Sequence, residues 1–181
     1  MVSNTEIVWV YGSSGSGKET FIRHIIDNKP TELLKRLGWL GKKLQLCSES
    51  VNHIAQFYQD PVGDKRGELL DSVFRLAQNE NSVVLIKGQD LDLKHKRLIR
   101  LREKLPERDH KIIFLHANIQ ELYRRWHLKS WWEESFTEET VKEWLVPQIE
   151  SLERLSDVFE ITSLESDAEK KYKTVKFPPK M

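Results

Sequence analysis

Seven residues near the N-terminus combine glycines, serines and a lysine at a spacing suited to binding an anion. The run is Gly12, Ser13, Ser14, Gly15, Ser16, Gly17 and Lys18, which matches the pattern G-x-x-x-x-G-K. Glycines allow backbone conformations that a side chain would forbid, so that successive N–H groups can point at one anion. The lysine adds a positive charge for the outer phosphates of a bound chain. The pattern therefore predicts that a loop from Gly12 to Thr20, which contains this run together with Glu19 and Thr20, binds the phosphates of a nucleoside triphosphate.

The residues on either side of this run predict the elements that hold it in place. Residues 7–11 form a continuous apolar run, as expected of a parallel strand that is buried on both faces. In residues 21–27 the apolar side chains recur at helical spacing. A helix that opens at about Lys18 directs its N-terminal partial positive charge at the anion. The strand, the glycine-rich turn and the helix are the structural context that the pattern requires.

Strands and helices alternate along the rest of the chain. Apolar runs predict further strands at residues 44–47, 82–87, 111–116 and 158–162. Helical spacing, and a capping pattern from Ser135 to Glu138, predict helices at residues 68–78, 98–105 and 135–157. This alternation predicts a three-layer α/β/α fold whose sheet is mostly parallel, with about five strands. We expect one nucleotide-binding domain over residues 1–167 and a basic C-terminal tail over residues 168–181.

Composition argues against several classes of protein. The 29 Lys and Arg residues nearly balance the 28 Asp and Glu residues, which argues against binding nucleic acid by bulk charge alone. No segment approaches the roughly 18 apolar residues that span a bilayer, and residues 1–6 lead directly into a strand instead of a signal peptide. Cys47 is the single cysteine and cannot form an internal disulfide. We therefore expect a soluble, cytoplasmic protein with no membrane partner.

The two residues after Lys18 depart from the usual pattern. A Ser or Thr that holds Mg²⁺ normally follows the lysine, whereas here Glu19 follows it and Thr20 comes next. An acid followed by a hydroxyl residue resembles a variant of the P-loop kinases, among them the ribose 1,5-bisphosphate phosphokinases and some phage deoxynucleotide kinases. Glu19 could bind Mg²⁺ directly or through water, or it could be an acid favoured by the helix dipole. Both Glu19 and Thr20 are therefore predicted Mg²⁺ ligands.

The chain as a whole resembles the small nucleotide and metabolite kinases of the P-loop nucleoside triphosphate hydrolase superfamily, such as guanylate kinases. In these kinases the region after the fourth strand forms a lid whose arginines close over the phosphates, and residues 122–140 match it. The resemblance implies that Arg124, Arg125 and Lys129 neutralise charge on the transferred phosphoryl group. The alternative is a solvated basic helix face. The same stretch is crowded with tryptophans, which we expect to pack a hinge instead of stacking on a base.

The resemblance also implies a polar or acidic residue after the third strand, where it orients Mg²⁺ or the acceptor. Asp90 is the candidate, although Lys87 and Gly88 separate it from the strand, and its alternative role is that of a turn residue or helix cap. The acceptor is expected beyond the carboxyl ends of the strands, where residues 48–66 are the candidate segment. No guanine-reading Asn-Lys-x-Asp motif follows a strand, so ATP is the expected donor.

Three functions agree with these features. The favoured one is an ATP- and Mg²⁺-dependent phosphotransferase that moves the γ-phosphoryl group to a nucleotide or small metabolite. The second is a nucleotide-binding regulatory module or slow NTPase that acts on a partner, which the unusual Glu19 supports. The third is a polynucleotide-end kinase, suggested by the basic residues 94–97 with Arg100 and Arg102. Such a run is more often a solvated helix face, so nucleic acid is not the favoured partner.

Overall fold

Six strands form the sheet of the protein. The computed structural model describes residues 4–48, 50, 65–88, 96–169 and 171–180. The strands are β1 (Glu6–Tyr11), β2 (Lys43–Leu46), β3 (Ser82–Lys87), β4 (Asp109–His116), β5 (Glu160–Ser166) and β6 (Tyr172–Val175). Their order in the sheet is β2-β3-β1-β4-β5-β6, in which β1 and β2 pair with β3 in parallel and β5 pairs with β6 antiparallel. The predicted α/β fold with a mostly parallel sheet is confirmed, with one strand more than expected.

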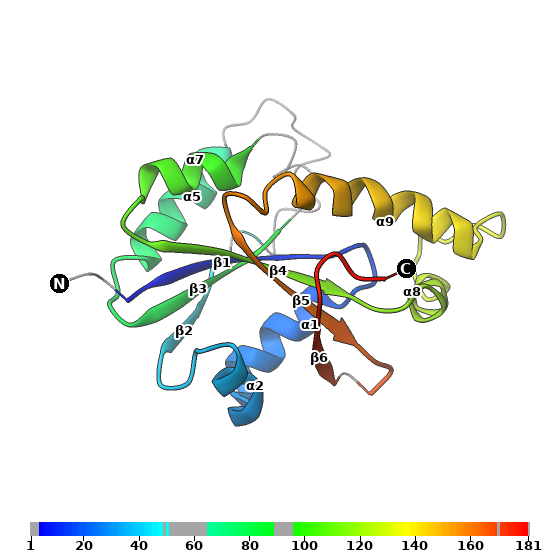
Figure 1. The fold of residues 1–181 in the computed structure, drawn as a ribbon, viewed down its shortest axis with the longest axis horizontal. Helices are drawn as coiled ribbons and strands as arrows, with labels where there is room; N and C mark the ends of the chain where they lie inside the picture. Colours follow the sequence, from blue (N-terminus) through cyan, green and yellow to red (C-terminus); the bar gives the residue numbers. More distant parts are fainter. Residues whose placement is uncertain (1–3, 49, 51–64, 89–95, 170, 181) are drawn as a thin grey trace. The chain divides into compact units, whose positions relative to one another are not determined.

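The chain divides into two compact units. One consists of Met1–Val10 and Glu19–Lys111, and the other of Tyr11–Lys18 and Ile112–Met181. The helices of the first unit are α1 (Lys18–Arg23), the π-helical turn η1 (His24–Asn28), α2 (Thr31–Arg36), α5 (Lys65–Leu76) and α7 (Arg97–Lys104). Figure 1 shows α5 and α7 on one face of the strands of this unit, and α1 and α2 on the other face. No helix within the described ranges has the length and hydropathy that crossing a bilayer requires.

Strands β1 and β3 form the centre of the first unit. All their residues are buried, and the pairing runs from Glu6 opposite Val83 to Val10 opposite Lys87. Continuous apolar runs are typical of parallel strands covered by helices on both faces. Each fully buried Val, Ile or Leu side chain contributes about 1.5–3 kcal/mol relative to an exposed one. This burial holds the end of β1, from which the glycine-rich run continues, in a fixed position within the sheet.

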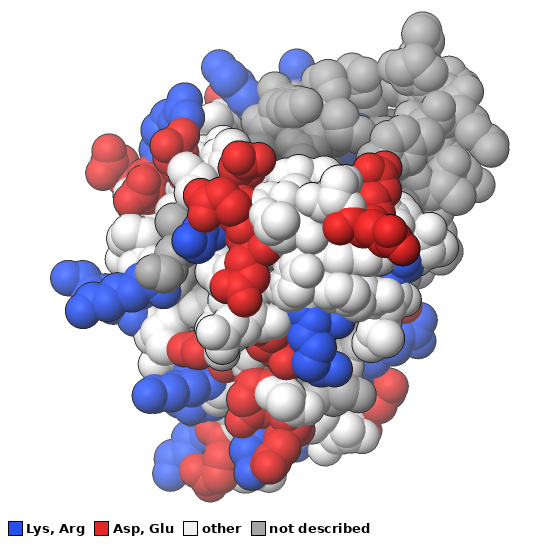
Figure 2. All heavy atoms as spheres, turned by 90° about the vertical axis from the view of Figure 1, so that its right-hand side faces the viewer, with Lys and Arg blue, Asp and Glu red and all other residues white. Residues whose placement is uncertain are grey.

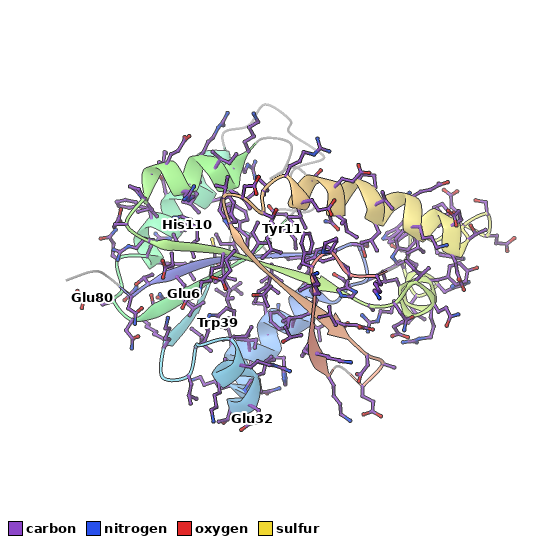
Figure 3. The ribbon with its side chains drawn as sticks, viewed as in Figure 1. Glu6, Tyr11, Glu32, Trp39, Glu80 and His110 are labelled. Carbon is purple, nitrogen blue, oxygen red and sulfur yellow. The ribbon has the colours of Figure 1, made fainter. Side chains whose placement is uncertain are left out.

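Glu6, the first residue of β1, has a buried carboxylate that joins three segments of the first unit. Its Oε2 accepts a hydrogen bond from Nε1 of Trp39 at 3.2 Å and pairs with Nζ of Lys111 at 3.1 Å, while Oε1 pairs with Lys42. Figure 3 labels Glu6 and Trp39 on neighbouring elements. Burial alone would raise the pKa of Glu6, but the bonds and charges of Lys42 and Lys111 outweigh it and lower the pKa below its usual value.

Helices α8 (Ile119–Trp126) and α9 (Glu138–Glu153) pack against each other in the second unit, as Figure 1 shows. The side chain of Asn118 caps α8 by accepting a hydrogen bond from the backbone N–H of Glu121. Thr137 caps α9 in a reciprocal capping box with Thr140. The cap therefore lies two residues beyond the predicted Ser135. The reason is that Phe136 N donates to Glu133 O, so the chain still turns there before extending at Thr137.

Part of the basic tail forms a hairpin with β5. Strand β6 pairs with β5 from Ser166 opposite Tyr172 to Ser163 opposite Val175. In the turn between them Oδ1 of Asp167 accepts the backbone N–H groups of Glu169 and Lys171, each at 2.9 Å. The domain boundary at residue 167 stays a prediction. Through the hairpin, part of the tail contributes a strand to the sheet.

Charged side chains of both signs are interspersed on the face that Figure 2 shows. Acidic residues lie between the basic ones, with uncharged surface among them. This pattern follows from the nearly equal numbers of acidic and basic residues in the chain. On this face, the described residues form a mixed surface instead of a single basic area.

Candidate phosphate-binding site

Tight packing shapes the loop of residues 12–18 between β1 and α1. A Cβ atom at Gly12 would overlap the carbonyl oxygen of Leu115 and the Oγ of Ser16, so that no larger residue fits at this position. The N–H of Ser16 donates to the carbonyl oxygen of Ser13 at 3.1 Å and closes a turn. Gly15 has a φ of +77°, which a residue with a side chain rarely adopts. The shape of the loop therefore depends on glycine at both positions.

The ammonium group of Lys18 turns back onto this loop. Its Nζ donates to the carbonyl oxygen of Gly12 at 2.6 Å and to that of Ser13 at 3.2 Å. The amide of Gln148, a buried residue of α9, also donates to the Gly12 oxygen, at 3.4 Å. These contacts hold the charge of Lys18 at the loop, where the outer phosphates of a triphosphate are expected to bind.

Two consecutive side chains of α8 hold the next three carbonyl groups of the loop. Nε1 of Trp126 donates to the carbonyl oxygen of Ser14 at 2.7 Å. NH1 of Arg125 donates to the oxygens of Gly15 at 3.2 Å and Ser16 at 3.4 Å. Together with the bonds from Lys18, each carbonyl oxygen from Gly12 to Ser16 accepts a hydrogen bond from a side chain.

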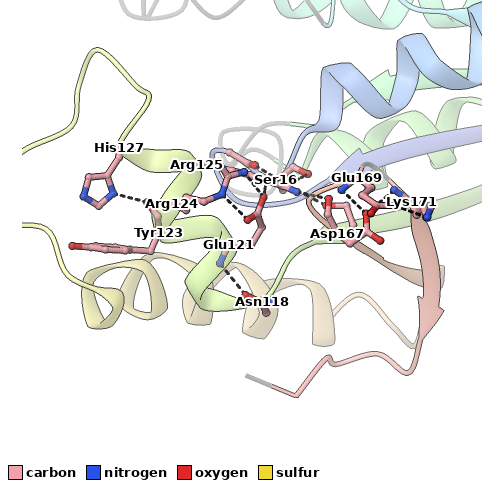
Figure 4. Close-up of polar contacts among 12 residues, drawn as sticks. Ser16, Asn118, Glu121, Tyr123, Arg124, Arg125, His127, Asp167, Glu169 and Lys171 are labelled. Atoms are coloured by element: carbon pink, nitrogen blue, oxygen red, sulfur yellow. Dashed lines mark hydrogen bonds and ion pairs between the residues drawn. The ribbon is translucent and has the colours of Figure 1, made fainter.

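The guanidinium group of Arg125 also binds three other parts of the second unit (Figure 4). Its NH1 donates to Oγ of Ser166 at 3.1 Å and its NH2 to the carbonyl oxygen of Asp167 at 3.0 Å, both at the end of β5. Its Nε donates to Oε1 of Glu121, one turn earlier in α8, at 2.7 Å. Arg125 thus joins the loop, α8 and the β5–β6 hairpin.

Arg124 and Lys129, the other cations predicted to act in catalysis, lie on the surface. Arg124 donates two hydrogen bonds of 2.8 Å to Glu121, and 59% of its side chain is exposed, against 17% for Arg125. Lys129 is also exposed. The bonds from Arg124, and then those from Arg125, lower the pKa of Glu121 to about 2. Glu121 therefore stays ionised and holds both arginines at neutral pH.

The predicted lid contains an aromatic cluster centred on Trp126. The buried ring of Trp126 packs edge-on against Trp131 and Trp144, with both ring centroids at 5.1 Å, and against Phe136 at 6.3 Å. Trp132 stacks on His127 beside it at 3.8 Å. The tryptophans thus pack on one another, and Trp126 links their cluster to the carbonyl oxygen of Ser14.

The first two predicted Mg²⁺ ligands lie in the first unit. Oε1 of Glu19 accepts two hydrogen bonds from Arg23, at 2.9 and 3.1 Å, and Oε2 lies 3.5 Å from Nζ of Lys87. The bonds from Arg23 are the main cause of the lowered pKa of Glu19. Thr20 is exposed. The side chain of Glu19 is thus already paired with cations, whereas Thr20 is an exposed residue.

Two predictions fall largely outside the described residues. The third predicted Mg²⁺ ligand, Asp90, is one of them, and most of the candidate acceptor segment at residues 48–66 is the other. Among the residues that are described, no group of three or more His, Cys, Asp or Glu side chains could hold a metal ion.

The loop fits a phosphate group by its donors. The Oγ of Ser16 is buried and finds no hydrogen-bond partner within the described part of the chain. Neighbouring atoms lie so close to Gly12 that no side chain fits there, and only the backbone forms this part of the loop. Hydroxyl, backbone N–H and ammonium donors at the start of a helix are the groups that bind phosphate in proteins. Residues 12–18 therefore suit the phosphate chain of a nucleotide.

Comparison with known proteins supports the fold to which this loop belongs. No protein-family model and no curated protein matches the sequence. A shikimate kinase from Acinetobacter baumannii, solved in complex with shikimate, is similar over 91% of this chain and 84% of that chain, with a TM-score of 0.51 and 16% identity. The chain has the fold of the small P-loop kinases. The similarity thus supports the predicted fold, whereas membership of the superfamily stays a prediction.

Two further solved structures with the P-loop kinase fold are similar to the chain. A gluconokinase from Sinorhizobium meliloti covers 88% of this chain and 82% of its own, with a TM-score of 0.49 and 17% identity. A shikimate kinase from Bacteroides thetaiotaomicron covers 91% and 90%, with a TM-score of 0.48 and 14% identity. The comparisons do not support the narrower resemblance to guanylate kinases or ribose 1,5-bisphosphate phosphokinases, which stays a prediction.

Proposed function

We propose that the protein is an ATP- and Mg²⁺-dependent phosphotransferase that moves the γ-phosphoryl group to a nucleotide or small metabolite. The observation that carries the proposal is the ammonium of Lys18, which is hydrogen-bonded to Gly12 and Ser13 within a glycine-rich loop. The fold shared with a shikimate kinase supports a small-molecule acceptor. We place the reaction in a reducing compartment such as the cytoplasm, because Cys47 is the single cysteine and cannot form an internal disulfide.

In this proposal each candidate residue has a stated part. Residues 12–18 bind the phosphate chain, and the charge of Lys18 stabilises its outer oxygens. Bound Mg²⁺ would neutralise charge on the same oxygens, with the hydroxyl of Thr20 favoured as its ligand over the paired Glu19. Arg124 and Lys129 are exposed on the predicted lid of residues 122–140, from which they would meet the transferred phosphoryl group.

A second candidate function is a nucleotide-binding regulatory module or slow NTPase that acts on a partner. The observation that favours it is the pairing of Glu19 with Arg23 and Lys87, because a carboxylate neutralised by two cations is a poor metal ligand. A polynucleotide acceptor is less favoured. Of the basic residues that suggested it, Arg97 is buried with an exposed fraction of 2%, so it does not belong to a solvated basic face.

The test is a search for an acceptor. The protein is incubated with ATP, Mg²⁺ and pools of small metabolites and nucleotides, and ADP formation is measured beside that of Lys18→Met. We expect at least one pool to accelerate ADP formation by the parent and not by the variant. If no pool does so while ATP still binds, the regulatory function is favoured instead. Salt-sensitive binding of single-stranded nucleic acid would favour the polynucleotide acceptor.

A further inference from the structure

The carbonyl groups of the loop are held by α8, which begins more than 100 residues after the loop in the sequence. The two side chains involved are adjacent, and the three oxygens that they bind are consecutive. We propose that Arg125 and Trp126 are positioning residues, which hold the carbonyl oxygens of Ser14, Gly15 and Ser16 towards α8 and so direct the N–H groups of Gly15 and Gly17 at the phosphate chain. This inference rests on the proposed function, because it concerns the site that binds the triphosphate.

The argument begins with the geometry of the peptide unit. In a planar trans peptide the C=O group and the N–H group that follows it point in opposite directions. The bond from Trp126 to the Ser14 oxygen therefore turns the N–H of Gly15 away from α8. In the same way, the bond from Arg125 to the Ser16 oxygen turns the N–H of Gly17 away from α8.

Glycine makes such external support necessary. Gly15 and Gly17 have φ values of +77° and +88°, and a glycine reaches many other conformations with little cost. A loop that had to adopt one conformation only when its ligand arrived would lose binding free energy to this ordering. Side chains that order the loop beforehand remove that loss. The hydrogen bonds from α8 supply this order within the second unit.

The contacts of Arg125 suit a positioning role better than contact with the transferred phosphoryl group. Its guanidinium donates five hydrogen bonds with protein acceptors, two of them to the loop. The other acceptors are Glu121, Ser166 and Asp167, which surround the group from α8 and from the end of β5. A lid residue would have to leave all of these bonds in order to reach the phosphoryl group. For Arg125 we therefore replace the catalytic role expected from the sequence by one that acts through the loop.

Packing fixes the indole of Trp126 in the orientation that its hydrogen bond needs. A Cβ atom at Gly15 would lie 3.0 Å from Cδ1 of Trp126, so the ring already touches the loop. The rings of Trp131 and Trp144 pack against its other parts. The ring has no room to turn away from the Ser14 oxygen. The aromatic cluster thus contributes to the shape of the loop through this single indole N–H.

The experiment measures the binding of inorganic tripolyphosphate by calorimetry to the parent, Trp126→Phe and Arg125→Lys. Trp126→Phe keeps an aromatic ring and removes the indole N–H, and Arg125→Lys keeps the charge and removes the fork. We expect each variant to lose about fivefold to tenfold in affinity, as expected for one or two hydrogen bonds. Trp132→Phe, at a ring that stacks on His127, and Arg154→Lys, at an exposed position, are the matched control changes, for which we expect affinity within about twofold of the parent.

A spectroscopic readout separates positioning from general stability. In the parent we expect the amide resonances of Gly15 and Gly17 to shift when tripolyphosphate binds. In Trp126→Phe the shift of Gly15 should be reduced, while amides of β6 remain as in the parent. Equal changes throughout the second unit would indicate a loss of structure and would overturn the proposal.

The outcomes distinguish the inference from the function on which it rests. If Trp126→Phe and Arg125→Lys both bind tripolyphosphate with the affinity of the parent, the positioning role is overturned and the proposed function is not. Equal losses in the control variants Trp132→Phe and Arg154→Lys overturn it as well. If the parent binds no tripolyphosphate, the proposed function fails and this inference fails with it. If either Trp126→Phe or Arg125→Lys does not fold, the remaining one is compared with Ser166→Ala, which removes an acceptor of Arg125. Parental affinity in both of these proteins overturns the proposal.

Discussion

Glu19 and Lys87 form an ion pair in which Oε2 of the carboxylate lies 3.5 Å from Nζ of the ammonium group. Each residue departs from the pattern of the kinases that the chain resembles, since Glu19 stands where a hydroxyl is usual and Lys87 ends the strand after which an acid is expected. The side chain of Lys87 is almost buried, with 9% exposed, so its charge needs a partner. The two departures therefore compensate each other in charge.

The first prediction concerns the metal. Because both oxygens of Glu19 are paired with cations, we expect Thr20 to be the residue that meets Mg²⁺. Thr20→Val should raise the Mg²⁺ concentration needed for half-maximal ATP turnover by about tenfold, as for the loss of a direct ligand or its partner. Glu19→Gln keeps the shape of the side chain and should change that concentration less. A larger effect of Glu19→Gln in this titration would make the carboxylate the ligand.

The second prediction concerns Lys18. Its ammonium is the charge that the loop presents to the outer phosphates, so Lys18→Met should lower phosphoryl transfer by about 10²–10³-fold, as for the loss of one electrostatic stabiliser. Affinity should fall more for ATP than for adenosine. Turnover and the two dissociation constants are measured side by side. Parental turnover by this variant would show that the loop does not take part in catalysis.

The third prediction concerns the exposed arginine of the predicted lid. If Arg124 meets the phosphoryl group only in the transition state, Arg124→Gln should lower kcat by about tenfold and change the dissociation constant for ATP much less. Lys142→Gln is the matched control, because Lys142 is also exposed and also pairs with a glutamate three residues away. If both variants behave alike, Arg124 belongs to a solvated helix face and the regulatory function is favoured.

The fourth prediction concerns acid stability. The pKa of Glu121 is about 2 in the folded protein and 4.5 in its ordinary state, because Arg124 and Arg125 donate to the ionised carboxylate. A lowered pKa contributes stability that is fully present above pH 4.5 and is lost as the pH falls from 4.5 towards 2. Thermal melting should therefore show a fall in Tm across this window that is smaller in Glu121→Gln. The same pH dependence in both proteins would assign the loss to other carboxylates.

The central strands and the loop were predictable because their signals are local. Residues 83–86 are apolar with no break, and β3 has the predicted limits, residues 82–87. The last strand is different: it was predicted at residues 158–162, yet β5 runs from Glu160 to Ser166. Its second half contains two serines, Ser163 and Ser166, and both are buried. Because serine is not an apolar residue, the apolar run used to predict the strand ended at residue 162, before the end of β5.

The support of the loop was not predictable, since it comes from distant residues. Trp126 and Gln148 bind carbonyl groups of the loop across separations of 112 and 136 residues. In the sequence Trp126 is one of several tryptophans and Gln148 is a polar residue of a helix. Their spacing to the loop carries no signal, because only the folded sheet brings them to it. The sequence thus identifies the groups that bind a ligand more readily than those that hold these groups in place.

The long-range hold on the loop has a consequence for the order of events on the ribosome. The glycine-rich run is synthesised before the side chains that hold it: its partners on α8 follow about a hundred residues later, and the hairpin that anchors Arg125 follows α8. Contacts between such distant residues form late in folding, because the chain must lose the entropy of a long closed loop before the contact can stabilise it. A nascent chain released before Asp167 would therefore carry the whole glycine-lysine motif without its partners. Under the proposed function, the ability to bind nucleotide would be acquired only after residue 167 has been synthesised, in a late step of folding.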